Sequence, residues 1–290
     1  MKVGVFGSNS QQKAKESIVQ VFDIFKTGQA KVWIEQEFYE YLRQELNYNP
    51  PFVGLITDAN FDLDFALSLG GDGTFLRTAT FIGRKGIPII GINTGRLGFL
   101  ADIHADEIEN TLEEIFNKDF LVEDRSLLKL ETAEYLVNPY TYALNEIAIL
   151  KRETSSMISI HTYINEAYLT TYLADGLVVS TPTGSTAYSL SVNGPILVPQ
   201  AKSFVLSPIA PHSLNVRPLV IPDDYDMNFE VEVRGGNFLV SMDGRSEVFS
   251  SGAKFSIKKA DFTTKIIKRK NQTFYQTLRD KLFWGRDIRE

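Results

Sequence analysis

Apolar positions in the first hundred residues follow two alternating periods. Compact apolar runs predict strands at residues 2–6, 31–34, 63–69 and 87–92. Between them, apolar residues three or four positions apart predict helices, one containing Ile18, Val19, Phe22 and Phe25 and others at residues 38–46 and 74–82. Strands that alternate with helices favour a parallel sheet. We therefore expect an α/β domain over residues 1–118, with a loop at 47–60 and a closing helix at 103–116.

The pattern changes after about residue 119 to many short strand-like segments separated by turn residues. They lie at residues 127–131, 142–150, 158–164, 168–173, 177–180, 228–233, 238–242, 254–257 and 262–267. We read Asn165-Glu166 as one hairpin turn, and Gly235-Gly236 as a second that joins 228–233 to 238–242. This pattern of short strands and turns predicts a β-rich, β-sandwich-like domain over residues 119–268. Residues 269–290, with a helical pattern at 272–282, are expected to pack back on the N-terminal domain.

Composition excludes several classes of protein. The 290 residues carry a net charge of −6, which argues against a general binder of nucleic acid or anionic membranes. No apolar stretch approaches the roughly 20 residues of a membrane span, and the first residues read as a strand instead of a signal peptide. The sequence has no cysteine, so disulfides and thiolate metal sites are excluded. We expect a soluble, cytoplasmic protein.

Three glycines surround one carboxylate in Gly70-Gly71-Asp72-Gly73, between a predicted strand and a predicted helix. Open parallel sheets bind ligands at such strand ends, and the unpaired N–H groups of a helix start suit phosphate. Asp72 should repel phosphate there unless a metal bridges them or a substrate hydroxyl lies between. One interpretation makes Asp72 the N-cap of the helix. The other makes it the group that orients or deprotonates an acceptor hydroxyl in phosphoryl transfer.

A second informative stretch, residues 180–191, runs from a predicted strand into a loop rich in Ser and Thr. These hydroxyls suit sugar hydroxyls, base edges or phosphate oxygens, but Ser and Thr also form turns and caps without any ligand. Asp175, just before the strand, either accepts from a ligand hydroxyl or marks a turn. Both alternatives stay open at this point.

Asn145 and Glu146 interrupt the apolar strand predicted at 142–150. Adjacent strand residues point to opposite faces, so at least one of the two side chains should point inward. A buried Glu needs a partner or a function. The alternative is a polar pair that faces water at a sheet edge.

Several enzyme classes lack their motifs in this chain. There is no G-x-x-x-x-G-K-[ST] loop, no G-x-G-x-x-G after a strand and no G-x-S-x-G elbow, which disfavours P-loop NTPases, Rossmann dehydrogenases and serine hydrolases. The three histidines, His104, His161 and His212, are scattered along the chain, so a zinc site is not expected.

Taken together, the motifs resemble those of the bacterial NAD kinases. The matching residues are Gly70-Gly71-Asp72-Gly73-Thr74, Asn93-x-Gly95-x-Leu97-Gly98-Phe99-Leu100, Asn145-Glu146, Asp175-Gly176, the Ser180–Ser191 stretch, Pro211-His212-Ser213-Leu214 with Arg217-Pro218-Leu219, and Leu278-Arg279-x-Lys281-Leu282-x-Trp284-Gly285. The first loop also occurs in lipid kinases and phosphofructokinases, whereas its combination with Thr-Pro-Thr-Gly-Ser-Thr-Ala-Tyr is specific. The resemblance implies transfer of the γ-phosphoryl group of ATP to the 2′-hydroxyl of the adenosine ribose of NAD, giving NADP. It also implies a divalent metal such as Mg²⁺ carried with ATP, and a homo-oligomer, often a tetramer.

Carried over by position, the resemblance assigns activation of the 2′-hydroxyl to Asp72. It places Arg77 on the nucleotide, Phe99 near the adenine, and Asn145 with Glu146 on ribose hydroxyls and base. Asp175 and the 186–191 turn match the rest of the NAD pocket, partly lent across a subunit interface. The residues expected to bind NAD or ATP are Gly71, Gly73, Thr74, Arg77, Phe99, Asn145, Glu146, Asp175, Thr186, Ala187, Tyr188, Ser189, Leu190, Ser191 and Arg245. No protein ligand is assigned to the metal.

The chain departs from the family pattern in two places. Ser191 is followed by Val-Asn-Gly-Pro where many members have Ala-Gly-Gly-Pro, and Arg245 stands where many have Gln. Two other functions compete with the kinase. A lipid kinase would need an apolar acceptor pocket or a membrane-facing surface, which the charge of −6 and the hydroxyl-rich loop do not suit. A non-catalytic dinucleotide sensor would not need a carboxylate such as Asp72 beside the 2′-hydroxyl.

Overall fold

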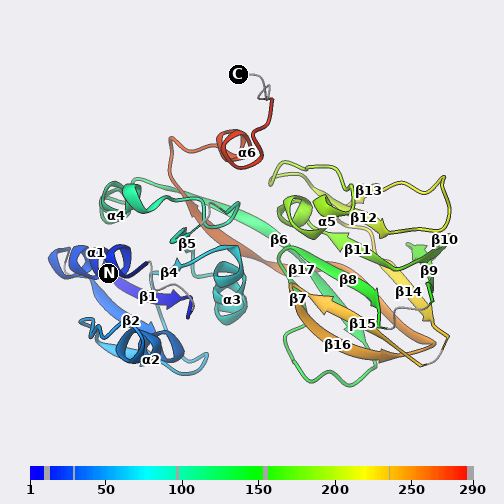
Figure 1. Ribbon diagram of the computed structural model, residues 1–290, viewed down its shortest axis with the longest axis horizontal. Coiled ribbons are helices and arrows are strands. Elements are labelled where there is room, and N and C mark those ends of the chain that lie inside the picture. Colours follow the sequence, from blue (N-terminus) through cyan, green and yellow to red (C-terminus); the bar gives the residue numbers. More distant parts are fainter. Residues whose placement is uncertain (10–13, 29, 96–97, 153–155, 235, 286–290) are drawn as a thin grey trace. The chain divides into compact units, whose positions relative to one another are not determined.

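The computed structural model describes residues 1–9, 14–28, 30–95, 98–152, 156–234 and 236–285. The chain folds as two compact units (Figure 1), Met1–Asp124 together with Thr264–Glu290, and Arg125–Thr263. It passes from the first unit into the second within strand β6 (Leu121–Thr132) and returns within strand β17 (Ala253–Lys268). Each unit has its own apolar core.

The first unit contains a parallel sheet in the order β5-β4-β1-β2-β3. Its strands are β1 (Lys2–Gly7), β2 (Lys31–Glu35), β3 (Gly54–Ile56), β4 (Phe65–Leu69) and β5 (Ile89–Ile92). The end of β17 adds to β5 in parallel through Ile266 and Ile89. The helices of this unit are α1 (Lys15–Thr27), α2 (Gln36–Gln44), α3 (Asp72–Ile82), α4 (Ile108–Phe116) and α6 (Phe274–Leu282), and the 3₁₀ turns are Gly83–Lys85 and Ala105–Glu107.

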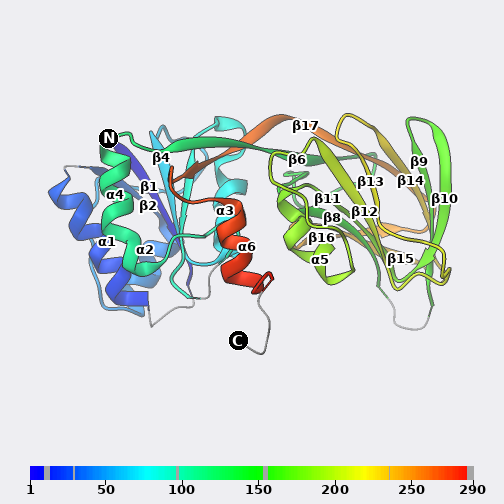
Figure 2. The ribbon, with the colours of Figure 1, turned by 90° about the horizontal axis from the view of Figure 1, so that it is seen from above.

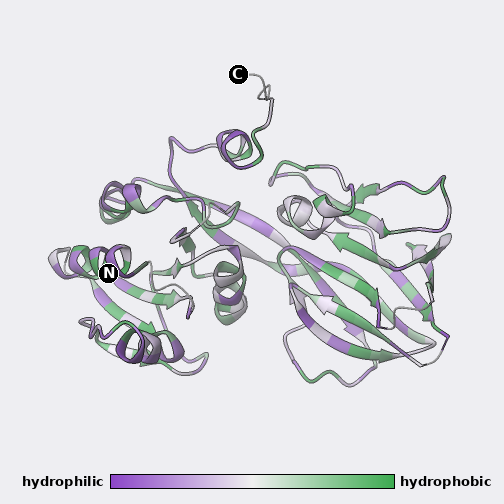
Figure 3. Cartoon of the chain, viewed as in Figure 1, coloured by the Kyte–Doolittle hydropathy of each residue, from purple (hydrophilic) through white to green (hydrophobic). Residues whose placement is uncertain are grey.

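Strand alternation divides the core of the first unit between the two faces of the sheet. Val3 and Val5 point to one face, where they join buried residues of α1, α2 and α4 in a single cluster. Helices α1 and α4 lie side by side in both views (Figures 1 and 2), and apolar and polar residues alternate along them (Figure 3). On the other face α3 packs so closely that a Cβ on Gly91 would lie 2.9 Å from the Phe75 ring and 2.8 Å from the Ala101 Cα. This close packing fixes α3, which carries the glycine loop at its start.

The second unit confirms the expected β-rich domain. One antiparallel sheet has the order β13-β12-β11-β8-β15-β16, and the other contains β10-β9-β14-β17, with β6 pairing to β17 and β7. The strands are β7 (Tyr142–Ala143), β8 (Glu146–Lys151), β9 (Ile158–Ile164), β10 (Ala167–Ala174), β11 (Gly176–Ser180), β12 (Ser203–Ile209), β13 (Leu219–Pro222), β14 (Met227–Glu232), β15 (Asn237–Met242) and β16 (Arg245–Ser250). A 3₁₀ turn, Thr183–Thr186, and a short helix, α5 (Tyr188–Ser191), follow β11.

Four predictions of secondary structure were wrong in detail. The 47–60 loop contains β3, an edge strand too short to show a period. The helix predicted at 103–116 begins at Ile108, because Ile103 instead forms a parallel bridge with Ile92. The strand predicted at 142–150 is broken at residues 144–145, and the two predicted at 254–257 and 262–267 form one strand, β17.

The hairpin predicted between residues 228–233 and 238–242 was also wrong. Strand β14 pairs with β9 and β17, whereas β15 pairs with β8 and β16, so the two lie in different sheets. Of the Gly235-Gly236 pair, Gly235 lies outside the described residues. The hairpin of β15 is made with β16 instead, through Asp243 and Gly244, whose φ angles are 48° and 83°. The hairpin turn at Asn165-Glu166 is present, with φ angles of 46° and 69°. Over the described residues, no helix combines the length and the apolarity needed to cross a membrane.

Candidate active site

The glycine loop connects the buried strand β4 to the start of α3. Gly70 has a φ of +155°, and a Cβ there would lie 2.4 Å from the Thr74 Oγ1, so this position requires glycine. A Cβ on Gly71 or Gly73, in contrast, would meet nothing within 4 Å. Gly71 is the N-cap and Asp72 is already inside the helix, so the interpretation of Asp72 as the N-cap was wrong. The loop thus leaves open space above the first turn of a helix, where a ligand can reach the backbone.

The Asp72 carboxylate is held by three successive backbone N–H groups. Phe99 donates to Oδ2 at 2.9 Å, and Leu100 and Ala101 both donate to Oδ1 at 3.0 Å. Gly98 is needed for this approach, because a Cβ there would lie 1.9 Å from Oδ1. The three donors occupy both carboxylate oxygens and fix the plane of the group. The sequence motif around this turn includes Leu97, which lies outside the described residues.

A cation from α6 lies beside this carboxylate. The Lys281 Nζ is 3.8 Å from the Asp72 Oδ2 and 4.7 Å from the centre of the Phe99 ring. The Phe99 ring also lies 6.3 Å from the ring of Phe274, at the start of the same helix. Sequence reasoning assigned no role to Lys281, although it belongs to the closing motif. Only the folded chain brings residue 281 to residue 72.

Arg77 is engaged within the protein. Its Nη1 donates to the buried Glu35 carboxylate at 2.5 Å, and its Nη2 donates to the carbonyl of Gly7 at 2.5 Å. Burial raises the pKa of Glu35, and the Arg77 guanidinium lowers it. The described contacts of Arg77 join α3 to the ends of β1 and β2. Its expected contact with the nucleotide stays a prediction.

In the second unit, Asp243 makes the same kind of contact as Asp72. Its Oδ2 accepts from the Leu144 N–H at 2.7 Å, and its Oδ1 accepts from those of Asn145 and Glu146 at 2.9 and 3.1 Å. These bonds form the bend that breaks the predicted strand, so Asn145 lies before β8 and Glu146 begins it. Arg245, next to this carboxylate in the chain, donates to the Tyr142 carbonyl at 2.5 Å and stacks 5.0 Å from the Tyr140 ring. Asp243 had not been predicted as part of a site.

Three buried polar oxygens near this bend have no hydrogen-bond partner among the described residues. They are the Asn145 Oδ1, the Glu146 Oε2 and the Ser180 Oγ. Ser180 lies directly opposite Glu146 across the β8–β11 pair, and the Thr181 N–H donates to the Asn145 carbonyl, so the three residues are neighbours. Buried polar groups are rarely left unpaired. The cluster therefore indicates a place where a ligand supplies the missing bonds.

Electrostatics single out Glu146 within this cluster. Burial is the main cause that raises its pKa to about 8, with a smaller contribution from Asp243, while an N–H bond from Tyr188 lowers it. Burial also raises the pKa of Asp243, against its three N–H donors and the positive charge of Arg245. Two buried carboxyls so close together do not readily share two negative charges. At neutral pH Glu146 is therefore largely protonated and able to donate one hydrogen bond.

Most hydroxyls of the 180–191 loop bond to other groups of the protein, some within the loop and some outside it. The Thr181 Oγ1 donates to the Leu144 carbonyl at 2.6 Å, the Ser185 Oγ donates to the Pro182 carbonyl at 2.7 Å, and the Thr186 Oγ1 donates to the Thr183 carbonyl at 3.3 Å. The buried Ser189 hydroxyl lies 3.1 Å from that of Ser207. These bonds fit the structural interpretation of the loop, and the assignment of Thr186 and Ser189 to substrate stays a prediction.

Other parts of the same turn remain accessible. Tyr188 and Ser191 are exposed, and Ala187 and Leu190 are half-buried. Gly184 brings the turn against the Asn145–Glu146 bend, since a Cβ at Gly184 would lie 2.1 Å from the Asn145 carbonyl oxygen. The internal hydroxyl bonds thus fix a turn whose outer surface adjoins the three unpaired oxygens.

Asp175 lies at the other end of these strands. It pairs with Lys151 at 2.6 Å, where β8 ends and β11 begins, and both line a cavity of about 650 Å³. Glu146 and Ser180 occupy the opposite end of the same strand pair, which at about 3.3 Å per residue is roughly 15 Å away. Within one copy of the chain, Asp175 is therefore not brought together with the Asn145–Glu146 bend.

The described residues contain no group of three or more His, Cys, Asp or Glu side chains that could hold a metal ion. Magnesium commonly uses one or two carboxylates together with substrate phosphates instead of a full protein cage. Asp72 fits that pattern as a single carboxylate at a helix start, although its oxygens already accept three N–H bonds.

Comparisons with known proteins agree with this arrangement. Residues 5–120 match the ATP-NAD kinase N-terminal domain, and residues 144–269 match the ATP-NAD kinase C-terminal domain. The NAD kinase of Bacteroides fragilis is 50% identical over 289 residues, which cover 100% of both chains. The crystal structure of an NAD kinase from Archaeoglobus fulgidus in complex with ATP is similar with a TM-score of 0.77 and 26% identity, covering 98% of this chain and 99% of that one. The yeast NADH kinase complexed with NADH shares the fold, with a TM-score of 0.87 at 22% identity over 99% of this chain and 89% of that one. The chain belongs to the NAD kinase family.

Proposed function

We propose that this NAD kinase uses Asp72 to orient and deprotonate the 2′-hydroxyl of the adenosine ribose of NAD while the γ-phosphoryl group of ATP is transferred to it. The observation that carries the proposal is the fixed Asp72 carboxylate, held by three N–H donors beside glycines that leave open space. The Asp72 carboxylate would repel a phosphate group that bound directly against it. A hydroxyl between the carboxylate and the phosphate removes that conflict.

The proposed step moves one proton and one phosphoryl group. The bond from the ribose 2′-oxygen to the γ-phosphorus forms, the bond from that phosphorus to the β–γ bridging oxygen breaks, and ADP leaves. The hydroxyl proton passes to the Oδ2 of Asp72, which accepts only one of the three N–H bonds. A ribose hydroxyl has a pKa far above 7, so the proton moves late and Asp72 acts mainly by orienting the nucleophile.

For NAD recognition we assign the unpaired oxygens of Asn145, Glu146 and Ser180 to polar groups of the dinucleotide. Protonated Glu146 donates one hydrogen bond and Asn145 accepts one, which suits ribose hydroxyls or base edges. Tyr188 and Ser191 contribute from the accessible surface of the adjoining turn. Thr186, Ala187 and Leu190 shape that turn, and the buried Ser189 supports it from inside.

A divalent metal, Mg²⁺, is assigned to the triphosphate, with Asp72 as the available protein carboxylate. When bound, it would neutralise phosphate charge. The contacts of Asp72 with its backbone donors, and its role toward the hydroxyl, do not depend on which oxygen of the triphosphate holds the ion.

We assign Asp175 to the NAD pocket of a second copy in a homo-oligomer, with a tetramer as the expected state. Its separation from Glu146 within one chain is consistent with this assignment, because Asp175 does not adjoin the Asn145–Glu146 bend of its own copy. A cytoplasmic location fits the cysteine-free composition.

The assay that tests the function is direct. The purified chain is incubated with ATP, MgCl₂ and NAD, and NADP is followed with an NADP-specific dehydrogenase. We expect NADP to form in proportion to enzyme and ATP. NAD binding by calorimetry without NADP formation would favour a dinucleotide sensor. Phosphorylation of diacylglycerol in place of NAD would favour a lipid kinase.

A further inference from the structure

Lys281 is the cation that lies beside the Asp72 carboxylate in the first unit. Its Nζ is 3.8 Å from the Asp72 Oδ2, too far for a hydrogen bond but well within electrostatic range. The side chains of Lys281 and Asp72 keep 30% and 31% of their surface exposed. The ammonium therefore faces solvent at the carboxylate oxygen to which we assign the hydroxyl proton.

The contacts of Lys281 differ from those of an ordinary surface ion pair. Asp72 already accepts three N–H bonds, so it does not need an ammonium donor to satisfy it. The Lys281 Nζ itself lies over the Phe99 ring, 4.7 Å from the ring centre, and this cation–π contact positions the ammonium without a hydrogen-bond acceptor. Among the described residues, no hydrogen-bond acceptor is recorded for Nζ. Its three donors remain for a ligand.

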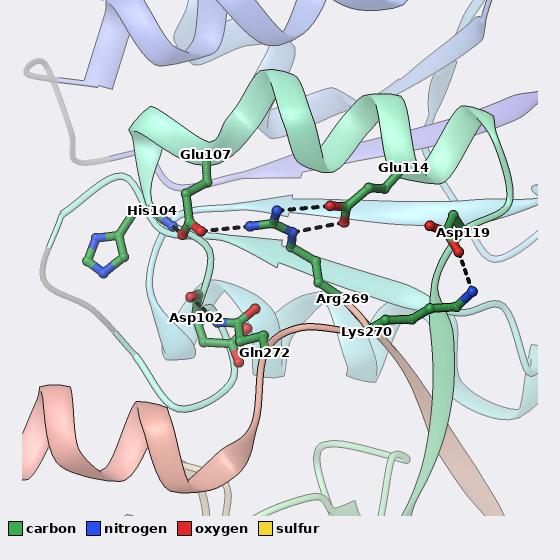
Figure 4. A network of polar contacts seen from close by, with 8 residues as sticks. All are labelled: Asp102, His104, Glu107, Glu114, Asp119, Arg269, Lys270 and Gln272. Atoms are coloured by element: carbon green, nitrogen blue, oxygen red, sulfur yellow. Dashed lines mark hydrogen bonds and ion pairs between the residues drawn. The ribbon is translucent and has the colours of Figure 1, made fainter.

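The segment that carries Lys281 is firmly attached to the first unit. Before α6, Arg269 donates to both Glu114 oxygens at 2.9 Å and to Glu107 at 2.7 Å (Figure 4). Lys268 pairs with Asp102 at 2.5 Å. Charge-assisted, paired guanidinium bonds of this kind fix position as well as contributing stability.

Two further contacts lie closer to α6 itself. The Gln272 side chain donates to the Asp102 carbonyl at 2.7 Å, and the Thr273 side chain caps α6 by accepting from the Gln276 N–H. The start of α6 is thereby attached to Asp102, the residue that directly follows the 98–101 turn. The position of Lys281 follows from these contacts, since α6 runs only from Phe274 to Leu282.

We propose that Lys281 is a second catalytic residue, whose ammonium binds the oxygens of the phosphoryl group as it transfers to the hydroxyl beside Asp72. The proposal rests on the function assigned to Asp72. It also explains how the site tolerates the negative charge of Asp72. The carboxylate repels the triphosphate, whose phosphoryl oxygens carry the negative charge of the transition state. A cation next to the carboxylate offsets the repulsion and stabilises the equatorial oxygens of the transition state.

The test compares Lys281→Met with a matched control, Lys85→Met. The Lys85 Nζ also lies 4.7 Å from the centre of a phenylalanine ring, that of Phe61, and it donates to the Phe61 carbonyl at 3.0 Å. We expect Lys281→Met to lower kcat at saturating ATP and NAD by about 10²-fold, the usual effect of one transition-state donor. Lys85→Met should keep wild-type kcat. Both variants should lose similar, small amounts of thermal stability.

A second variant and a pH series distinguish a direct role of the ammonium from an indirect one. Lys281→Arg should recover part of the lost kcat because it keeps the charge, and the loss in Lys281→Met should persist across the pH range. Recovery of Lys281→Met at high pH would mean that the ammonium acts only through the Asp72 carboxylate and not on the phosphoryl oxygens, and would overturn the proposal. Wild-type kcat in Lys281→Met would overturn it as well. If the wild-type chain itself makes no NADP, the assigned function fails instead.

Discussion

Asp72 and Asp243 show how single carboxylates organise each unit. Each accepts N–H bonds from three successive residues, 99–101 for Asp72 and 144–146 for Asp243. In both cases a side chain far away in the sequence holds an irregular turn in place. The residues that such a turn presents are then fixed before any substrate binds, which lowers the entropic cost of binding.

Glu146 gives a prediction at the scale of one residue. Its pKa is raised to about 8 in the folded chain, chiefly by burial, and lies near its ordinary value of 4.5 when unfolded. Between these two values the folded state keeps a proton that the unfolded state releases, so the free energy of unfolding falls as pH rises. In Glu146→Gln, which cannot ionise, that part of the pH dependence should vanish.

The measurement is the thermal midpoint of both proteins, without ligand, from about pH 5 to about pH 8. We expect the midpoint of the wild type to fall relative to that of Glu146→Gln over this range. The variant is the control for the titrating groups that do not interact with Glu146; the neighbouring Asp243 carboxyl is coupled to it, so the difference between the curves belongs to the pair. Parallel curves for the two proteins would show that Glu146 is ionised throughout.

At the scale of elements, the 98–101 turn and the start of α3 depend on each other. In Gly98→Ala the new methyl would lie 1.9 Å from the Asp72 Oδ1, so the carboxylate or the turn must move. A displacement of about 1 Å can cost about 10²-fold in rate, and we expect a loss of kcat of this size in a folded protein. Circular dichroism measures whether the variant is folded, and the rate of NADP formation measures its kcat.

Gly73→Ala is the informative counterpart. Its methyl would meet nothing within 4 Å, and alanine is the better helix former, so the fold should be at least as stable as in the wild type. A raised KM for ATP or NAD in this variant would show that substrate uses the space above α3. If Gly98→Ala keeps full kcat, the fixed position of Asp72 is not required.

The sequence predicted well those strands and helices that show a clear spacing of apolar residues along their own length. Strands and helices of the first unit follow from apolar spacing, and the α/β and β-rich units are confirmed. Pairing between strands was harder, because β14 and β15 follow each other in the chain yet belong to different sheets. The alternation of each strand says which side is buried but not which strand lies beside it.

The candidate site shows the same limit. Asp72 stands out in the sequence because its carboxylate conflicts with a phosphate loop. Its donors at 99–101, its neighbour Lys281 and the Asp243 bonds to the 144–146 bend all join residues 27 or more positions apart. No local pattern marks such pairs, and a strand rule gave the wrong reason for the burial of Asn145. The roles of the individual site residues stay predictions.

The activity of the whole molecule depends, in the proposed function, on the Asp72 carboxylate acting on the 2′-hydroxyl of NAD. Asp72→Asn keeps the side-chain size and one acceptor oxygen for the backbone donors, but it removes the negative charge and the proton acceptor. Loss of a general base and orienting group typically costs 10²–10⁴-fold, so we expect turnover to fall by about 10³-fold. NAD affinity should change little, because the groups assigned to NAD recognition, Asn145, Glu146 and Ser180, are intact.

The decisive measurement is therefore NADP formation by Asp72→Asn at saturating ATP, Mg²⁺ and NAD, paired with calorimetry of NAD binding to the same preparation. We expect turnover to fall by about 10³-fold and the NAD Kd to stay within about threefold of the wild type. Turnover within about tenfold of the wild type would show that Asp72 neither orients nor deprotonates the 2′-hydroxyl.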